Sequence, residues 1–348
     1  MSHDYKAVQW TPFKKRFDLW MLAGIAVYLL VFIVVSGAAQ PSGESLHPVQ
    51  IIMRATGTLA FLLLTFILMI GPLARITARF KPFLYNRRHL GVTTFLIALV
   101  HAALVIMWYH GFSDLNPLVS VFASNPNYES LSGFPFESLG FVALIIMFLM
   151  AATSHDFWNA NLGPGLWKAL HMGVYAAYGL LFAHVALGAI QFEKHPLYVV
   201  LLCLSGTAVA GLHLYTGVSN LKSTQGTTLD GWLKVAAVDE MEEARAKIIR
   251  PAAGEAIAVF RNGATVSAVS NVCRHQGGPL GEGKIVDGCV TCPWHGFQYR
   301  LEDGRSPPPF TEKIATYDTR VVDGVVYVNP EPKAPGTPAS PSPIGVAA

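Results

Sequence analysis

Long apolar stretches constrain the fold of this chain more than any other feature. An α-helix rises 1.5 Å per residue, so about 20 consecutive apolar residues cross the hydrocarbon core of a bilayer. The composition agrees, since 52% of the 348 residues are hydrophobic and only 14% are charged. The sequence therefore predicts six transmembrane helices, of which the fourth is the shortest, at residues 19–35, 51–71, 89–109, 139–154, 166–190 and 197–218.

The first apolar run has a second interpretation. Basic residues at 14–16, the run itself and Gly37-Ala38-Ala39 together look like a secretory signal peptide with its cleavage site. The run is longer than the apolar core of most signal peptides. We therefore expect it to remain as a membrane helix, preceded by a short cytoplasmic segment at residues 1–18.

Basic residues are concentrated on one side of the predicted membrane region. They lie before the first span, at Lys6 and 14–16, and between the second and third spans, within 75–88. The loops at 40–50 and 110–138 contain no Lys or Arg. Because short loops rich in Lys and Arg stay in the cytoplasm, we expect a multi-pass protein of the cytoplasmic (inner) membrane with both termini inside. Membrane lipid is then a partner, whereas a net charge of +3 does not indicate nucleic acid.

The chain changes character after the last span. A tether rich in Ser, Thr and Gly occupies residues 219–231, and short β-like runs follow within 232–330. These runs are separated by dipeptides typical of hairpin turns, namely Asn262-Gly263, Asp287-Gly288, Asp303-Gly304 and Asp323-Gly324. Residues 331–348 are rich in Pro, Ala and Ser, and we expect them to be disordered. The predicted fold is a multi-domain membrane protein, with an all-α six-helix transmembrane bundle over 19–218 followed by a small all-β domain.

Two Cys–His pairs in the β domain have the spacing of a metal site. Cys273 and His275 form the first pair, and Cys292 and His295 form the second. Two thiolates and two imidazoles suit zinc as well as an iron–sulfur cluster. Glycine and proline next to each pair favour the cluster, because such turns let backbone N–H groups approach the inorganic sulfides. The other two cysteines, at 203 and 289, do not indicate a disulfide framework.

The two loops, C-R-H-Q-G-G-P-L and C-P-W-H-G, resemble the Rieske [2Fe–2S] module. The resemblance implies that Cys273 and Cys292 bind one iron and that His275 and His295 bind the other.

Respiratory Rieske proteins differ from this chain near the cluster. They have one more cysteine in each ligand loop and a serine soon after the second histidine. Here Gly277 or Gly278 and Trp294 occupy the cysteine positions, and Phe297 replaces the serine. Tyr299 remains as a hydrogen-bond donor to a cysteine sulfur. Losing a donor lowers the reduction potential, so the module resembles the ferredoxin and oxygenase type of Rieske domain.

Histidines inside the apolar spans are functional candidates, because ionisable residues are rare there. His101 lies in the third predicted span, and His171 and His184 lie in the fifth, which runs in the same direction. Counted from the nearest basic residue, His101 and His184 lie 13 and 16 residues deep, and His89 and His171 lie one and three residues deep. Each pair thus matches in depth, which predicts two stacked haems with bis-histidine ligation.

The membrane region resembles the ferric-reductase-like transmembrane family, and within it the haem-binding subunit of periplasmic methionine-sulfoxide reductase systems. The resemblance rests on R-R-x-L-G at 87–91 ahead of the third-span histidine, on L-H…Y…H within 170–184, and on Thr56-Gly57. It implies b-type haem with His101, His171 and His184 as axial ligands.

Both one and two haems remain open. His89 has no counterpart in that subunit, whereas NADPH-oxidase relatives have a ligand near its position. His213, in the last predicted span, is another candidate and could instead contact a quinone.

Together these features predict a membrane-bound electron-transfer oxidoreductase. No G-x-G-x-x-G unit provides a nucleotide domain, so we expect a separate cytoplasmic reductase or reduced carrier as donor. Electrons would pass from the Rieske cluster to membrane haem and on to a periplasmic or extracellular acceptor, which could be a protein. A membrane-tethered redox sensor is one alternative. The other is electron flow from quinol or haem inward to a cytoplasmic acceptor.

Overall fold

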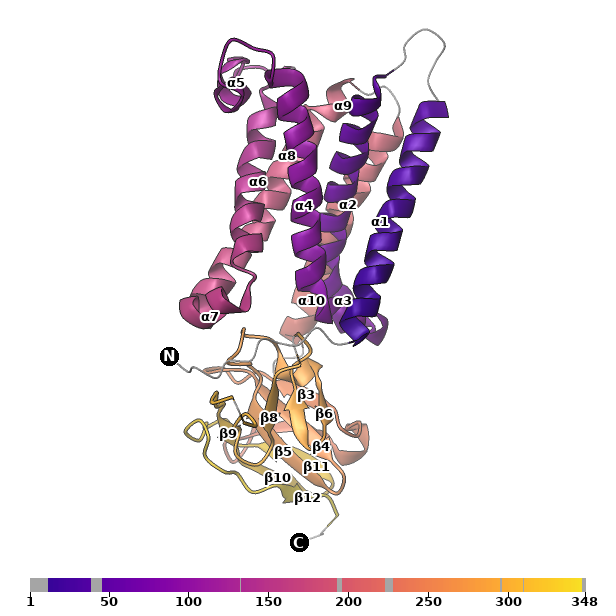
Figure 1. Ribbon diagram of the computed structural model, residues 1–348. Helices are drawn as coiled ribbons and strands as arrows, with labels where there is room; N and C mark the ends of the chain where they lie inside the picture. Colours follow the sequence, from indigo (N-terminus) through magenta and orange to yellow (C-terminus); the bar gives the residue numbers. More distant parts are fainter. Residues whose placement is uncertain are drawn as a thin grey trace.

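The chain folds into a bundle of helices with a smaller β domain stacked on one end (Figure 1). The structure is a computed structural model that describes residues 12–38, 46–131, 133–192, 196–222, 228–294, 296–308 and 310–345. Outside these ranges lie His295, residues 1–11 of the predicted cytoplasmic segment at 1–18, which include Lys6, residues 223–227 of the tether and residues 346–348 of the tail.

Five helical segments are long and apolar enough to cross a membrane, among the residues that the structure describes. They are Pro12–Ala38, Pro48–Ile76, Arg87–His110, Leu166–Gln191 and Pro196–Val218. A further apolar helix, α6, runs over Phe136–Ala152 and has only 17 residues. The predicted multi-pass helical region is therefore confirmed, with the expected short helix as its sixth member.

Several spans depart from a single straight helix. The elements are α1 (Pro12–Ala38), α2 (Pro48–Ile76), α3 (Lys81–Tyr85), α4 (Arg87–Val105), α5 (Pro117–Ala123), α6, α7 (Asp156–His171), α8 (Gly173–Leu187), α9 (Ala189–Phe192) and α10 (Pro196–Lys222). A π-helical turn, Ile106–His110, extends α4. The predicted fifth span is interrupted at Met172, where α7 ends and α8 begins. Figure 1 shows α7 lying at the end of the bundle that carries the β domain.

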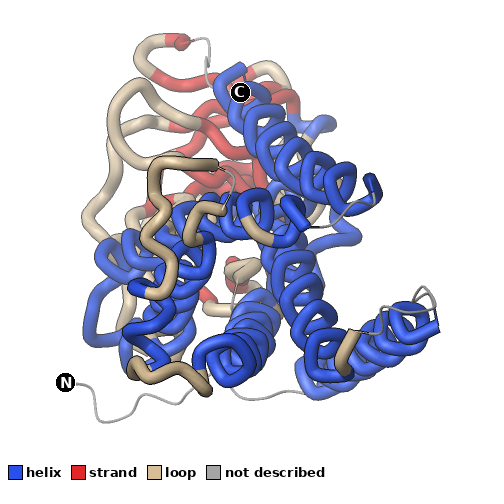
Figure 2. Tube along the Cα trace, turned by 90° about the horizontal axis from the view of Figure 1, so that it is seen from above, coloured by secondary structure: helices blue, strands red, loops and turns tan. Residues whose placement is uncertain are grey.

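The helices pack as a ring with α1 outside it (Figure 2). Helix α2 packs against α4 and α10, α4 packs against α6, and α6 packs most extensively against α8. Aromatic and aliphatic side chains of α2, α6, α8 and α10 form the buried core, including Phe61, Leu64, Met147, Tyr178 and Leu202. Helix α1 contacts chiefly α2 and has no buried residue, as expected for a helix that faces lipid.

The β domain contains three small antiparallel sheets. Their strands are β1 (Thr228–Leu229), β2 (Trp232–Ala237), β3 (Ala246–Ile249), β4 (Ile257–Asn262), β5 (Thr265–Ser270), β6 (Lys284–Val286), β7 (Cys289–Thr291), β8 (Gln298–Arg300), β9 (Thr316–Tyr317), β10 (Thr319–Val322), β11 (Val325–Val328) and β12 (Ser342–Pro343). The sheet orders are β1-β2-β11-β10, β12-β5-β4-β3 with β9 on β5, and β6-β7-β8. Two apolar cores result, and the second one contains Cys273 and Cys292, the two predicted cluster cysteines.

Three of the four predicted turn dipeptides join paired strands. Asp287-Gly288 joins β6 to β7 and Asp323-Gly324 joins β10 to β11, and both residues of each have positive φ. Asn262-Gly263 joins β4 to β5. Positive φ at both positions is the type I′ geometry that matches strand twist. Asp303-Gly304 instead lies in the long connection after β8.

The tail corrects one prediction. We expected 331–348 to be disordered, but residues 331–345 fold back onto the β domain. Strand β12 pairs with β5, the Ile344 amide donates to Ala264 at 2.7 Å, and Lys333 pairs with Asp318 at 2.6 Å. The composition of the tail did not predict this pairing, because the tail has too few apolar residues to form a core of its own. The open edge of β5 supplies the backbone partners.

Candidate functional site

The two predicted ligand loops of the cluster are closed in the same way. In the first, the Cys273 amide donates to Gly278 at 2.9 Å and the Gly277 amide donates back to Cys273 at 2.7 Å. The second repeats this pattern with Cys292, Phe297 and Gly296, at 2.8 and 2.9 Å. The glycine four residues after each cysteine has a φ of +71° or +73°, a conformation that costs little only for glycine.

The loops bring the two cysteines together. Cys273 and Cys292 are each 1% exposed, and their side chains lie within hydrogen-bonding range of each other. Gly278 is required by this approach, since a Cβ there would lie 2.8 Å from the Cys292 sulfur. The strands on either side hold the second loop, because Cys292 follows β7 and Gly296 precedes β8.

Hydrogen bonds favour negative charge on the sulfur of Cys273. Burial alone would raise the pKa of this thiol, but hydrogen bonds with Cys292, Tyr299 and the backbone amides of His275 and Gln276 outweigh burial and lower it. Backbone N–H groups therefore point toward this sulfur, as a cluster ligand requires.

Tyr299 occupies the donor position expected from the sequence. Its hydroxyl lies 3.5 Å from the Cys273 sulfur and accepts the Arg274 amide at 3.0 Å. Burial raises the pKa of Tyr299, and the neighbouring Cys273 raises it further. The phenol therefore stays protonated, and its O–H group can donate a hydrogen bond to the sulfur of Cys273.

His275 is 6% exposed and lies against the ring of Phe297, stacked with 4.9 Å between centroids and 7° between planes. Phe297, which replaces the respiratory serine, therefore orients this imidazole instead of donating a hydrogen bond. His295, the fourth predicted cluster ligand, lies outside the described residues.

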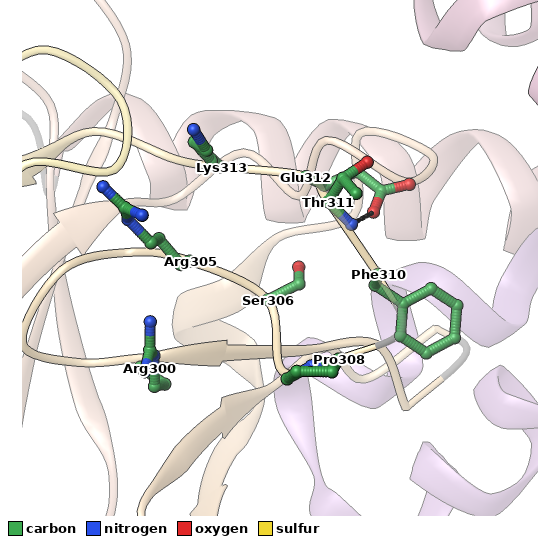
Figure 3. Close-up of a pocket in the computed structure, with 8 residues that line it drawn as sticks. All are labelled: Arg300, Arg305, Ser306, Pro308, Phe310, Thr311, Glu312 and Lys313. Carbon is green, nitrogen blue, oxygen red and sulfur yellow. Dashed lines mark hydrogen bonds between the residues drawn. The ribbon is translucent and has the colours of Figure 1, made fainter. Parts of the chain in front are cut away.

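A basic pocket of about 380 Å³ adjoins the cluster loops (Figure 3). Arg300, Arg305 and Lys313 line it, together with Ser306, Pro308, Phe310, Thr311 and Glu312. The Phe310 ring lies 4.7 Å from that of Phe297. None of the three predicted cluster ligands that the structure describes, Cys273, His275 and Cys292, lines this pocket, so it is a neighbouring surface of the β domain.

Among the histidines of the bundle, His101 and His184 have matching environments. Nδ1 of His101 lies 2.9 Å from the Met53 carbonyl of α2, and Nδ1 of His184 lies 2.8 Å from the Phe136 carbonyl of α6. A carbonyl accepts, so in both rings Nδ1 carries the proton and Nε2 has the lone pair. This is the tautomer of an iron-ligating histidine.

Each of these rings rests on a glycine. A Cβ at Gly57 would lie 2.8 Å from the His101 ring, and a Cβ at Gly140 would lie 2.8 Å from the His184 ring. Each glycine is four residues after the carbonyl that holds the same histidine. The two imidazoles are close enough to interact electrostatically, although α4 packs mainly against α2 and α8 packs mainly against α6. The structure thus brings this predicted pair together.

The other predicted pair is arranged differently. Nδ1 of His89 lies 2.8 Å from the carboxylate of Asp18 on α1. Nδ1 of His171 lies 3.0 Å from the Trp167 carbonyl, and its Nε2 lies 3.3 Å from the Ser154 hydroxyl. Both residues lie at the β-domain end of the bundle, but these contacts turn the His89 ring toward α1. The sequence did not indicate a role for Asp18, because nothing in the segment that forms α1 shows which helix it packs against.

His213, the remaining candidate, has both ring nitrogens engaged. Nδ1 lies 2.9 Å from the Val209 carbonyl and Nε2 lies 3.0 Å from the Tyr175 hydroxyl. In this structure it therefore links α10 to α8.

The cluster loops face the base of the bundle, where α2 ends and α4 begins. Trp294 packs against the core around Cys273 and Cys292, and also against the bundle core that contains Leu84 and Leu90. Arg87, the first residue of α4, lies over the Trp294 ring at 5.3 Å from its centroid. In the sequence, Trp294 is notable only because it occupies a position where respiratory Rieske proteins have a cysteine.

Polar contacts surround the apolar contact that Trp294 makes with the base of the bundle. Arg75, at the end of α2, pairs with Glu282 at 3.0 Å, and a Cβ at Gly277 would lie 4.0 Å from the Lys168 side chain. Burial raises the pKa of Tyr85, at the end of α3, and the neighbouring Cys292 raises it further. Residues of α2, α3, α4 and α7 thus surround the cluster loops.

Two family models match the chain, in agreement with these sites. One describes the ferric reductase-like transmembrane component and covers residues 56–182; the other describes the Rieske [2Fe-2S] domain and covers 231–318. The ferredoxin subunit of anthranilate 1,2-dioxygenase from Burkholderia cepacia is 39% identical over 29% of this chain and 94% of its own length. The heme-binding subunit MsrQ of protein-methionine-sulfoxide reductase from Herminiimonas arsenicoxydans is 31% identical over 48% of this chain and 70% of its own length.

The chain belongs to the ferric reductase-like transmembrane family and carries a Rieske ferredoxin domain at its C-terminal end. It spans 66% of the MsrQ subunit from Ralstonia nicotianae, which is 31% identical over 46% of this chain. Among solved structures, the ferredoxin in the complex of carbazole 1,9a-dioxygenase is 28% identical over 30% of this chain, with a TM-score of 0.29.

The protein is therefore a multi-pass membrane protein with a Rieske [2Fe–2S] cluster and haem, and its activity is electron transfer. Its residues fit both groups. The paired cysteines with amides aimed at sulfur suit a cluster iron, and the histidines that carry the proton on Nδ1 suit haem iron. The cluster and the haem supply one-electron chemistry, while the chain fixes their position and surroundings.

Proposed function

We propose that this protein carries electrons from a cytoplasmic donor through the Rieske cluster to membrane haem, and on to an acceptor across the membrane. One observation supports this path above all. The loops that bear Cys273 and Cys292 face the base of the bundle, at the end where α4 and α8 begin. A cluster there has the haem histidines of α4 and α8 above it.

For the ligands, we propose Cys273 and Cys292 on one iron of the cluster and His275 and His295 on the other. His101 and His184 are the proposed axial ligands of the haem far from the cluster, supported by their matched carbonyl and glycine contacts.

His89 and His171 are the proposed ligands of a second haem near the cluster. Both hold Nδ1 against an oxygen atom, a carboxylate for His89 and a carbonyl for His171. Iron-ligating histidines usually have such a partner. The His89 ring would have to turn from α1 toward α8, so counting haems per chain tests this second site separately.

Sidedness follows from charge. Lys and Arg are concentrated in the loops at the β-domain end, whereas the far loops at 40–50 and 110–138 contain none and the far connection between the fifth and sixth spans contains only Lys194. We therefore propose that the β domain lies in the cytoplasm. The donor is then a cytoplasmic reductase or reduced carrier. The acceptor is a periplasmic or extracellular one, and a redox partner in a methionine-sulfoxide reductase system is the acceptor that the MsrQ relatives favour.

Inverted membrane vesicles test the direction. A reduced flavoprotein added outside should reduce haem in the wild type, and a ferric chelate enclosed inside should reoxidise it. His275→Ala should remove the rhombic EPR signal of the reduced cluster and slow haem reduction, while the haem bands remain.

Haem reduction at an unchanged rate in His275→Ala would contradict entry through the cluster. If, in the wild type, a quinol reduced the cluster by way of haem, electrons would flow inward to a cytoplasmic acceptor instead. A cluster that exchanges no electrons with haem would support the sensor alternative.

A further inference from the structure

We infer that Trp294 is a positioning residue that holds the Rieske cluster in its electron-transfer position on the bundle. The inference rests on the proposed function, in which the cluster reduces membrane haem. It assigns to this side chain a role in the transfer step that is separate from ligating iron.

Trp294 is the one side chain, among the described residues, that packs against both the cluster core and the core at the base of the bundle. On the cluster side it lies two residues from Cys292, and a Cβ at Gly278 would lie 3.1 Å from its indole ring. On the bundle side the apolar partners belong to α2, α3 and the start of α4. The indole therefore spans the domain boundary at the cluster loop itself.

Arg87 adds a directional contact. Its guanidinium lies 5.3 Å from the centre of the indole ring, and a cation over an aromatic face is attracted by the ring quadrupole. Arg87 is the first residue of α4, the helix that carries His89 and His101. A shift of Trp294 is thus a shift of the cluster relative to that helix.

A second contact fixes rotation about this point. Arg75 Nε lies 3.0 Å from Glu282, which follows the first ligand loop. Both side chains are partly exposed, at 44% and 22%, so the pair contributes little to affinity and mainly sets orientation. Trp294 lies in the second ligand loop and Glu282 follows the first, so the two contacts together define the orientation of both loops on the bundle.

Electron transfer between two centres depends on the distance and the medium between them, so a cluster that lies farther from the bundle, or that moves relative to it, passes electrons more slowly. Replacing the indole by a smaller side chain leaves the four proposed iron ligands in place but removes the contact between the cores. The transfer rate should then fall while the properties of the cluster itself stay unchanged.

The experiment uses the full chain in nanodiscs. The cluster is reduced rapidly with less than one equivalent of reductant, and the rise of the reduced haem band is followed. We expect Trp294→Leu to slow this step severalfold and Trp294→Phe to retain most of the rate. The matched control is Trp232→Leu, since Trp232 also lies under an arginine, Arg320 at 4.6 Å, but belongs to β2 of the same domain.

Two measurements separate positioning from damage to the cluster. The EPR spectrum and the midpoint potential of the cluster should match wild type in Trp294→Leu. A short thiol cross-linker between Arg75→Cys and Glu282→Cys should give less product when Leu replaces Trp294. As a second route that does not touch the loop, Arg75→Glu should slow transfer by about two- to fivefold, and the swap Arg75→Glu with Glu282→Arg should restore it.

A wild-type transfer rate in Trp294→Leu, with an intact cluster, would overturn the inference. The same holds for equal loss in Trp294→Phe and Trp294→Leu, or in Trp232→Leu. The variant His275→Ala distinguishes failure of this inference from failure of the proposed function. If that variant slows haem reduction and Trp294→Leu does not, only the role of Trp294 is wrong.

Discussion

At the scale of single residues, glycines in the bundle decide where imidazoles can lie. Gly57 and Gly140 leave just enough room for the rings of His101 and His184 beside the carbonyls that hold them. A methyl group at either position would meet the ring at 2.8 Å, closer than any van der Waals contact allows. The helix or the imidazole would have to move.

Gly57→Ala or Gly140→Ala should therefore lower the haem content of the purified protein, because the displaced imidazole no longer presents Nε2 to iron. Gly71→Ala in α2 and Gly179→Ala in α8 are matched controls, since a Cβ there has no neighbour within 4 Å. Haem per chain, measured as the pyridine haemochrome, checks the result. Full haem content in both test variants would show that these histidines are not the ligands.

Tyr299 should tune the cluster potential. A hydrogen bond to sulfur stabilises the reduced, more negative cluster more than the oxidised one, so removing the phenol lowers the potential. Tyr299→Phe should shift it down by an amount on the order of tens of millivolts, as one modest hydrogen bond implies. Tyr317→Phe is the control, because Tyr317 is buried in the other core of the domain. A redox titration followed by EPR gives both potentials, and an upward shift in Tyr299→Phe would exclude donation to the cluster.

Much of this residue-level chemistry could be read from the sequence. Cys273, His275 and Cys292 stand in motifs whose spacing is a local property, and a histidine in an apolar helix is conspicuous. The supporting atoms could not be read. The Met53 and Phe136 carbonyls belong to other helices, and only the packing of α2 on α4 and of α6 on α8 brings them to the rings.

At the scale of elements, local turn chemistry was a reliable guide and edge pairing was not. Asp287-Gly288 and Asp323-Gly324 form hairpins because both residues adopt positive φ with little regard for context. Strand β12 forms only because β5 offers an open edge. The break of the fifth span at Met172 was likewise missed, since the run 166–190 contains no proline and is largely apolar apart from Lys168, His171 and His184.

The paired tail should stabilise the Rieske domain. Removing residues 331–348 deletes β12, the Lys333–Asp318 pair and the contact of Ile344 with the first core. One aliphatic side chain and a few hydrogen bonds correspond to about 2 kcal/mol or more. For a domain of this size we expect the midpoint of thermal unfolding, followed by loss of the cluster absorption, to fall by roughly 10 °C. Removal of 346–348 alone is the control, and an unchanged midpoint in the longer truncation would mean that the pairing adds no stability.

At the scale of the whole molecule, charge in the loops sets a testable orientation. A cysteine introduced at Ser124, in the loop at the far end, should react with a membrane-impermeant maleimide in intact spheroplasts. A cysteine at Thr311, on the exposed surface of the Rieske domain, should react only in inverted vesicles. The unmodified chain, with its exposed Cys203 in α10, gives the background. The reverse labelling pattern would place the Rieske domain outside and exclude a cytoplasmic donor.

The matched settings of His101 and His184 have a consequence for assembly. One ring is held by the α2–α4 pair and the other by the α6–α8 pair, so on the proposed ligand set a single haem fastens one half of the bundle to the other. Any ligand that binds only the folded state adds its binding free energy to stability. On this proposal, haem supply should influence how much of the protein a membrane keeps, because a less stable haem-free chain unfolds more often and is then open to proteases.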